Sequence, residues 1–117
     1  MTTAGKALLD LARRVRRVVN AADLYYLEAQ GDETDIRFRA ARPLRDVRSI
    51  AEVLGALGTQ AIVRIHRNHA VNAGRVLEIR PAGSGWEVVL EPPVSKVLPV
   101  SRRSVAALFA AYRPPES

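Results

Sequence analysis

The chain has 117 residues and is 48% hydrophobic, which fits one folded domain with one core and excludes a chain that is disordered throughout. It contains no cysteine, so disulfides and thiolate metal sites are excluded. Eighteen Lys and Arg against twelve Asp and Glu give a net charge of +6 and an isoelectric point near 10.7, which favours nucleic acid as a partner.

Residues 5–20 predict a basic amphipathic helix. Apolar residues recur every three or four positions, and arginines occupy the opposite face. Asp10, Arg13 and Arg14 interrupt the apolar run, so we expect neither a signal peptide nor a membrane span, and we expect a cytoplasmic protein. We assign residues 1–22 to this helix or a linker, residues 23–112 to a folded domain, and residues 113–117 to a disordered tail.

From residue 23 the pattern changes to strands. Residues 23–29 and 34–40 predict a hairpin, because the first segment is apolar and aromatic, apolar and polar side chains alternate in the second, and the intervening residues favour a turn. Helical spacing of apolar residues then predicts a helix over residues 45–58. Asp46 is its expected N-cap, and Gly58 is its expected C-terminal stop.

The second half of the chain predicts more strands and a closing helix. A strand at residues 60–66 is followed by a hairpin of residues 75–81 and 85–92. A short strand at 95–100 leads into a helix at 101–112, in which the first residue is the expected N-cap. Strands and helices do not alternate as in a parallel sheet, so we expect a mostly β fold of antiparallel sheets with short helices.

Residues 63–72, VRIHRNHAVN, are the most polar stretch that follows a buried strand. Alternation directs Ala61, Val63 and Ile65 inward and Arg64 and His66 outward, with the next three residues at the strand end. Such loops often bind ligands, although a solvated turn would show the same pattern. The chain has neither enough metal ligands nor a catalytic triad nor a phosphate-binding glycine loop, so we predict no enzyme activity, metal or cofactor.

Segments in this order and spacing resemble the LytTR family of bacterial DNA-binding domains. They are DLYYLEAQGDE, VRIHRNHAVNAGRVLEI and LPVSRRSVAALF, and the resemblance extends over residues 23–112. It implies an elongated fold of small antiparallel sheets that places loops in successive major grooves. It further implies a transcription regulator, such as the output domain of a response regulator, that binds tandem repeats as a homodimer.

The resemblance implies DNA contacts at residues 30–33, near Arg67 and at residues 100–103. We expect Arg67 and Arg102 to donate hydrogen bonds to base edges, with guanine as the natural partner. Phosphate contacts are expected from other polar side chains, namely Asn68, Arg103 and Lys96.

Some positions depart from the family pattern. Asn68 and His69 replace a Ser-Tyr pair, and Asp32 and Glu33 replace a polar residue followed by Tyr. Acidic side chains repel phosphate, so Asp32 is expected to contact DNA by accepting from a cytosine amine. We interpret His66 mainly as a structural residue and keep it among the candidate DNA contacts, together with Gln30 and His69.

We therefore predict a sequence-specific regulator that binds double-stranded DNA and responds to a separate regulatory protein or to a domain beyond this sequence. The alternative is a basic protein-interaction or membrane-surface module that acts through the helix at residues 5–20. RNA is less favoured, because aromatic residues that could stack on bases make up 5% of the chain.

Overall fold

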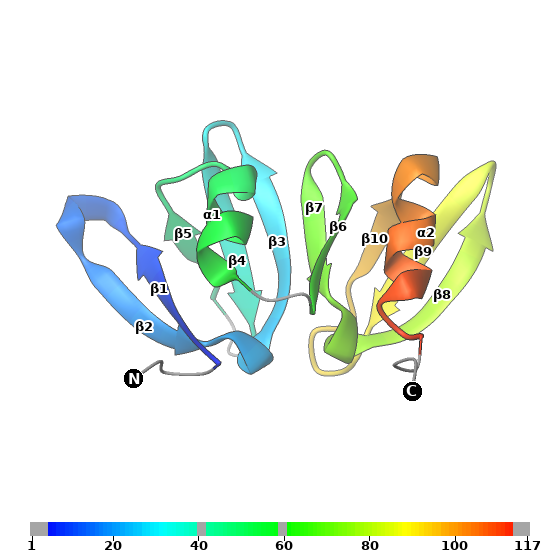
Figure 1. Cartoon of the computed structure of the whole chain (residues 1–117), viewed down its shortest axis with the longest axis horizontal. Coiled ribbons are helices and arrows are strands. Elements are labelled where there is room, and N and C mark those ends of the chain that lie inside the picture. The colour runs from blue at the N-terminus through cyan, green and yellow to red at the C-terminus, as the bar shows by residue number, and fades with distance from the viewer. Residues whose placement is uncertain (1–4, 40–41, 59–60, 114–117) are drawn as a thin grey trace.

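The computed structural model describes residues 5–39, 42–58 and 61–113, and these form three antiparallel sheets that lie side by side (Figure 1). The predicted mostly β fold with short helices is confirmed. The N-terminal sheet pairs β1 (Lys6–Asp10) with β2 (Arg16–Asn20). The C-terminal sheet has the order β10-β9-β8, with β8 (Val76–Ala82), β9 (Gly85–Leu90) and β10 (Val97–Val100).

The central sheet has the order β5-β4-β3-β7-β6. Its strands are β3 (Leu24–Gln30), β4 (Glu33–Phe38), β5 (Leu44–Asp46), β6 (Ile62–His66) and β7 (His69–Asn72). The helices are α1 (Ile50–Leu57) and α2 (Arg102–Ala110), and short 3-10 turns span Ala12–Arg14, Ala21–Asp23 and Ala73–Arg75.

The predicted helix at residues 5–20 is wrong, because this segment is the β1–β2 hairpin. Ala7 and Leu9 are buried with the core residues around α1, whereas their neighbour Leu8 is 44% exposed. Val18, which pairs with Leu8, is 64% exposed. Every second residue of β1 packs against the rest of the protein, and this burial favours a strand. It outweighs the helical spacing of apolar residues in the same segment.

The start of α1 also differs from the prediction. Ser49 is the N-cap: its Oγ accepts a hydrogen bond from the Glu52 backbone N–H, and the Glu52 carboxylate accepts one from the Ser49 N–H. Asp46 is instead a fully buried residue of β5. The predicted stop at Gly58 is confirmed, since Gly58 adopts a left-handed conformation with φ of 60°.

Two clusters of buried apolar residues are found in the described part of the chain. The first lies around α1, and the second joins the central sheet to the C-terminal sheet and α2. Strand β3 serves both, because Leu24 and Leu27 belong to the first cluster and Tyr25 to the second. This explains why β3 reads as a nearly continuous apolar run.

Strand β6 likewise contributes to both clusters, Ile62 to the first and Ile65 to the second. Its pairing with β7 has an irregular register between Arg64 and His66. The predicted strict alternation, with Ala61, Val63 and Ile65 inward, is therefore wrong at Ala61, which is exposed, and Val63 is half-buried.

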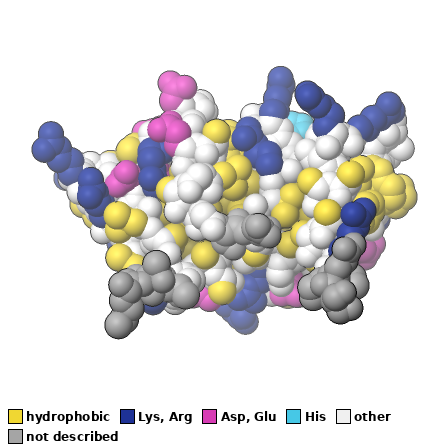
Figure 2. Space-filling view, in the orientation of Figure 1, with side chains coloured by type: hydrophobic (Ala, Val, Ile, Leu, Met, Phe, Trp, Pro, Cys, Tyr) yellow, Lys and Arg dark blue, Asp and Glu magenta, His cyan; other side chains and the backbone are white. Residues whose placement is uncertain are grey.

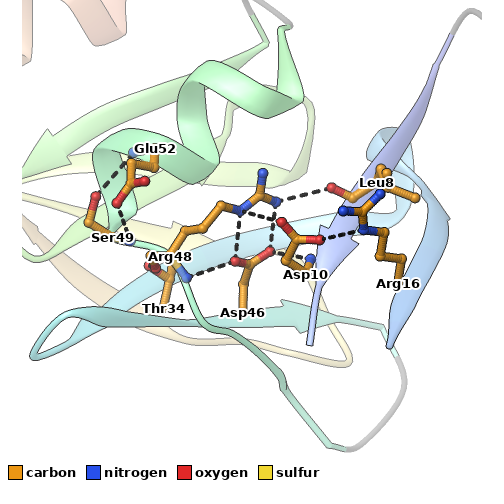
Figure 3. A network of polar contacts seen from close by, with 8 residues as sticks. All are labelled: Leu8, Asp10, Arg16, Thr34, Asp46, Arg48, Ser49 and Glu52. Atoms are coloured by element: carbon orange, nitrogen blue, oxygen red, sulfur yellow. Dashed lines mark hydrogen bonds and ion pairs between the residues drawn. The ribbon is translucent and has the colours of Figure 1, made fainter. Parts of the chain in front are cut away.

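The N-terminal hairpin is attached to the central sheet through Asp46 and Arg48 (Figure 3). Asp46 accepts hydrogen bonds from the backbone N–H of Asp10 at 2.9 Å and from the Arg48 guanidinium at 2.8 and 2.9 Å. Arg48 Nη2 also donates to the Leu8 carbonyl at 3.1 Å, and Asp10 forms an ion pair with Arg16 at 3.3 Å. Burial alone would raise the pKa of Asp46, but the hydrogen bonds from Arg48 and the Asp10 N–H outweigh it and hold the pKa below 3.8.

Replacing the buried Asn72 with alanine is expected to lower the free energy of unfolding by about 2 kcal/mol. Its Nδ2 donates to the Leu24 carbonyl and its Oδ1 accepts from the Gly74 N–H, both at 2.9 Å, so the variant leaves both groups without these partners. Urea unfolding measures the change. The matched control is Asn20→Ala, whose exposed amide makes a 3.5 Å contact with Asp23 and should matter little. Equal losses for both variants would contradict this role of Asn72.

Candidate nucleic-acid interface

Hairpin turns and the start of α2 lie along one edge of the molecule, the upper edge in Figure 1. We call it the turn edge and define it by residues 11–15, 31–32, 67–68, 83–84 and 101–103. The strand registers place the turns together. Antiparallel β3 and β7 pair Glu28 with His69, so the end of β3 and the start of β7 lie at the same edge of the central sheet.

Backbone hydrogen bonds connect neighbouring parts of the turn edge. The Ala29 N–H donates to the Asn68 carbonyl at 2.8 Å, which joins the β3–β4 and β6–β7 turns. The Ser101 N–H donates to the Ile65 carbonyl at 2.8 Å, which joins β6 to the start of α2. Arg102 Nη2 lies 3.4 Å from the Ser84 carbonyl in the β8–β9 turn. Two of these connections are therefore main-chain hydrogen bonds, and the β8–β9 turn is joined to α2 by the Arg102 side chain.

The β1–β2 turn lies on the same edge. Asp10, the last residue of β1, donates its N–H to Asp46, and Asp46 pairs across the sheet with Thr34. Thr34 directly follows the first residue of β4, next to the β3–β4 turn. Sequence reasoning missed this position for residues 11–15, because a helix would have spread them along its axis.

The β6–β7 turn presents Arg67 and Asn68 to solvent, as predicted from the strand end. Arg64 holds the turn from behind: its Nε donates to the His66 carbonyl at 3.0 Å and its Nη2 to the Arg67 carbonyl. The Asn68 N–H donates to His66 Nδ1 at 3.2 Å. Arg64 therefore holds the backbone of the turn in place, a role that the sequence analysis missed. Its predicted outward direction beside a polar turn could have indicated it.

The predicted residues Arg67, Arg102 and Arg103 come together around His66. A shallow hollow of about 340 Å³ has a polar lining, consisting of Arg64, His66, Arg67, Ser101, Arg103 and Ser104. A second hollow of about 460 Å³ reaches from His66 to Arg102 along β9 and β10. His66 lines both hollows and so lies between Arg67 and Arg103 on one side and Arg102 on the other. All three arginines are exposed.

Two other predicted residues do not share the exposure of this cluster: His69 is largely buried beside His66, with ring centroids 5.6 Å apart, and Lys96 lies at another edge. The His69 side chain is 14% exposed and its Nε2 lies 3.0 Å from Glu28 Oε2, across the β3–β7 pair. Its buried Nδ1 has no hydrogen-bond partner among the described residues. Lys96 is exposed at the opposite edge, since its carbonyl accepts from the N–H of Leu90, at the end of β9 far from the β8–β9 turn.

The β3–β4 turn brings acidic side chains to the turn edge. Asp32 is exposed, and Gln30 beside it donates to Glu28 at 2.9 Å. Glu33 lies 3.8 Å from Arg45, which also contacts Asp35 at 2.7 Å. Figure 2 shows acidic side chains in magenta on the upper left, with basic side chains in dark blue at both ends of the edge. The edge is therefore basic, acidic and basic along its length.

Comparison with known proteins identifies the family. A family model described as the LytTr DNA-binding domain matches residues 15–113. The chain belongs to the LytTR family. The predicted resemblance is confirmed, and the match begins within the N-terminal hairpin, before residue 23. LytTR domains are DNA-binding modules, so DNA is the partner that membership indicates.

A solved LytTR structure has the same fold. It is the LytTr DNA-binding domain of a Bacillus cereus protein described as a methyl-accepting/DNA response regulator. The TM-score is 0.72 at 19% sequence identity, and the match covers 92% of this chain and 95% of that one. No curated protein matches the sequence. In the described part of this LytTR domain, no helix is long and apolar enough to cross a membrane.

The stability of the LytTR fold is expected to depend on pH through His66. Burial lowers the pKa of His66 below 6.5, and the nearby His69, Arg67 and Arg64 lower it further. The folded state then binds a proton less readily than the unfolded state, so stability is full above pH 6.5 and falls as the pH drops toward the lowered pKa. Urea unfolding between pH 7 and 5 should show a smaller decline for His66→Gln than for wild type. Parallel declines would contradict this assignment.

Proposed function

We propose that this LytTR domain is a sequence-specific transcription regulator that lays its turn edge along double-stranded DNA. The observation that carries the proposal is the position of three exposed arginines on that edge: Arg67 and Arg103 line one hollow beside His66, and Arg102 lines the adjacent hollow that also reaches His66. Guanidinium groups form paired hydrogen bonds with guanine in the major groove and bind phosphates, so this cluster suits both kinds of contact.

The size of the molecule supports contact with more than one groove. It extends 42 Å along its longest axis, and the turn edge follows that axis in Figure 1. One turn of B-DNA is about 34 Å long, so turns at separate places on the edge can face successive major grooves. In this arrangement Arg67 and Arg102 read bases, Asn68 and Arg103 bind phosphates, and Asp32 accepts from a cytosine amine.

We further propose that two copies bind tandem repeats as a homodimer on DNA, in the cytoplasm. A regulatory partner protein or an attached domain would supply the signal. The response-regulator description of the Bacillus cereus relative supports such a role as an output domain. The membrane-surface alternative loses the element on which it relied, because residues 6–20 are a hairpin and not an amphipathic helix.

Selection of binding sites from a random double-stranded DNA pool tests the proposal. We expect an enriched motif in two copies about one helical turn apart, with at least a 10³-fold preference over random DNA. Affinity should be measured against salt concentration for the selected and for a scrambled duplex. Equal affinity for all sequences, lost as the salt concentration rises, would mean that binding results only from the net charge of +6, and it would overturn the proposal.

A further inference from the structure

The β1–β2 turn carries two arginines, Arg13 and Arg14, at the N-terminal end of the turn edge. Both are exposed, and in the part of the chain that the structure describes neither side chain makes a hydrogen bond or ion pair. The neighbouring Arg16, by contrast, is paired with Asp10. Two cationic groups therefore extend from the turn without a partner in the described fold.

Both arginines adopt a left-handed backbone conformation, each with φ of 62°. This conformation is unfavourable for residues with a Cβ, and turns usually place Gly, Asn or Asp there. Asn or Gly would relieve the strain, so positive charge is present here at a cost in backbone conformation. Strained residues often mark functional sites, which makes this turn a candidate for contact with an anion.

The turn is rigidly placed relative to the rest of the edge. Asp10 precedes it directly and donates its N–H to Asp46 at 2.9 Å (Figure 3). The Asp10 carbonyl accepts from the Val47 N–H at 2.9 Å. Arg48 adds a hydrogen bond to the Leu8 carbonyl at 3.1 Å. These bonds fix the hairpin on the central sheet, so the two arginines keep their place on the turn edge.

The order of charges along the edge explains what the two arginines would contact. The next turn toward the centre carries the exposed Asp32, which repels phosphates, and beside it Glu33, whose charge is partly offset by Arg45 at 3.8 Å. Arg67 and Arg102 lie beyond that acidic turn, on its other side. A DNA duplex along the edge would be attracted by Arg67 and Arg102 on one side of the acidic turn. Arg13 and Arg14 supply the basic contact on the other side.

We propose that Arg13 and Arg14 bind backbone phosphates on the flank of the DNA site, outside the base pairs that the other turns contact. This inference rests on the proposed function. Nothing among the described residues holds either guanidinium at a fixed angle, so the contact depends on charge and carries no base preference. The bound DNA then extends beyond the base pairs that the other turns contact, at the end that faces the N-terminal hairpin.

The experiment combines charge removal with trimming of the DNA. The double variant Arg13→Asn/Arg14→Asn removes the charge and keeps residues that tolerate the left-handed turn. Arg13→Lys/Arg14→Lys retains the charge, and Lys6→Asn removes a charge at the other end of the same hairpin. Each protein is titrated, over a range of salt concentrations, with the selected duplex and with duplexes shortened stepwise from either end.

We expect the double Asn variant to bind the full duplex roughly tenfold more weakly, with the dependence of log affinity on log salt reduced by about two. Trimming the duplex at one end should weaken binding by the wild type by the same factor, so that the wild type and the double Asn variant then bind equally. The double Lys variant and Lys6→Asn should bind every duplex as the wild type does. Wild-type affinity in the double variant, or a loss that persists on every trimmed duplex, would overturn the inference. Absence of any sequence preference in the wild type would instead overturn the proposed function.

Discussion

Arg67→Ala and Arg102→Ala are each expected to weaken binding to the selected DNA by about 1–3 kcal/mol and to relax the preference at one base pair. Each guanidinium is exposed on the turn edge, where it can reach a guanine edge as a two-pronged donor. Fluorescence anisotropy with the selected duplex and with single-base variants of it measures both effects. Loss of discrimination at different base pairs for the two variants would assign each arginine to its own place in the site.

Two further variants separate base reading from charge. Arg103→Ala should weaken all sequences about equally and lower the salt dependence by about one, as expected for a phosphate contact. Lys96→Ala was expected to do the same from the sequence, but Lys96 lies at the opposite edge and should now have little effect. If Lys96→Ala weakens binding as much as Arg102→Ala, the turn edge is not the DNA-binding surface.

Asp46→Ala is expected to lower the free energy of unfolding by about 3 kcal/mol. The variant leaves the Arg48 guanidinium, 23% exposed, without its closest carboxylate, and removes the acceptor of the Asp10 N–H. The N-terminal hairpin would then lose part of its attachment to the central sheet. Urea unfolding measures the loss. The matched control is Asp35→Ala, which removes an ion pair with the more exposed Arg45 and should change stability far less.

The contribution of Asp46 should also depend on pH. Because its folded pKa lies below 3.8, the carboxylate stabilises the fold fully above that pH and loses this contribution as the pH falls through the lowered pKa. The difference in unfolding free energy between wild type and Asp46→Asn should therefore shrink below pH 3.8. A difference that stays constant down to pH 2 would assign the effect of the substitution to packing.

Elements with a local pattern could be predicted from the sequence. An apolar segment, a turn at Gly31 and an alternating segment predict the β3–β4 hairpin, and two strand-like segments joined by a turn at residues 82–85 predict β8–β9. The three motifs placed the chain in the LytTR family, and the strand end at Arg67 gave the centre of the candidate interface. In each case neighbouring residues specify the structure, so one-dimensional spacing is sufficient.

Tertiary structure alone decided the N-terminal segment and the roles of several polar residues. Residues 6–20 fit a helix by spacing, but burial of Ala7 and Leu9 against the core around α1 selects strands, and the arginines of the turn then join the edge. Asp46, an expected N-cap, is a buried acceptor because Arg48 and Asp10 surround it. The attachment of β1 depends on contacts between residues far apart in the sequence, such as Asp10 and Asp46 at a separation of 36 positions, and these contacts outweigh the local preferences that a sequence displays.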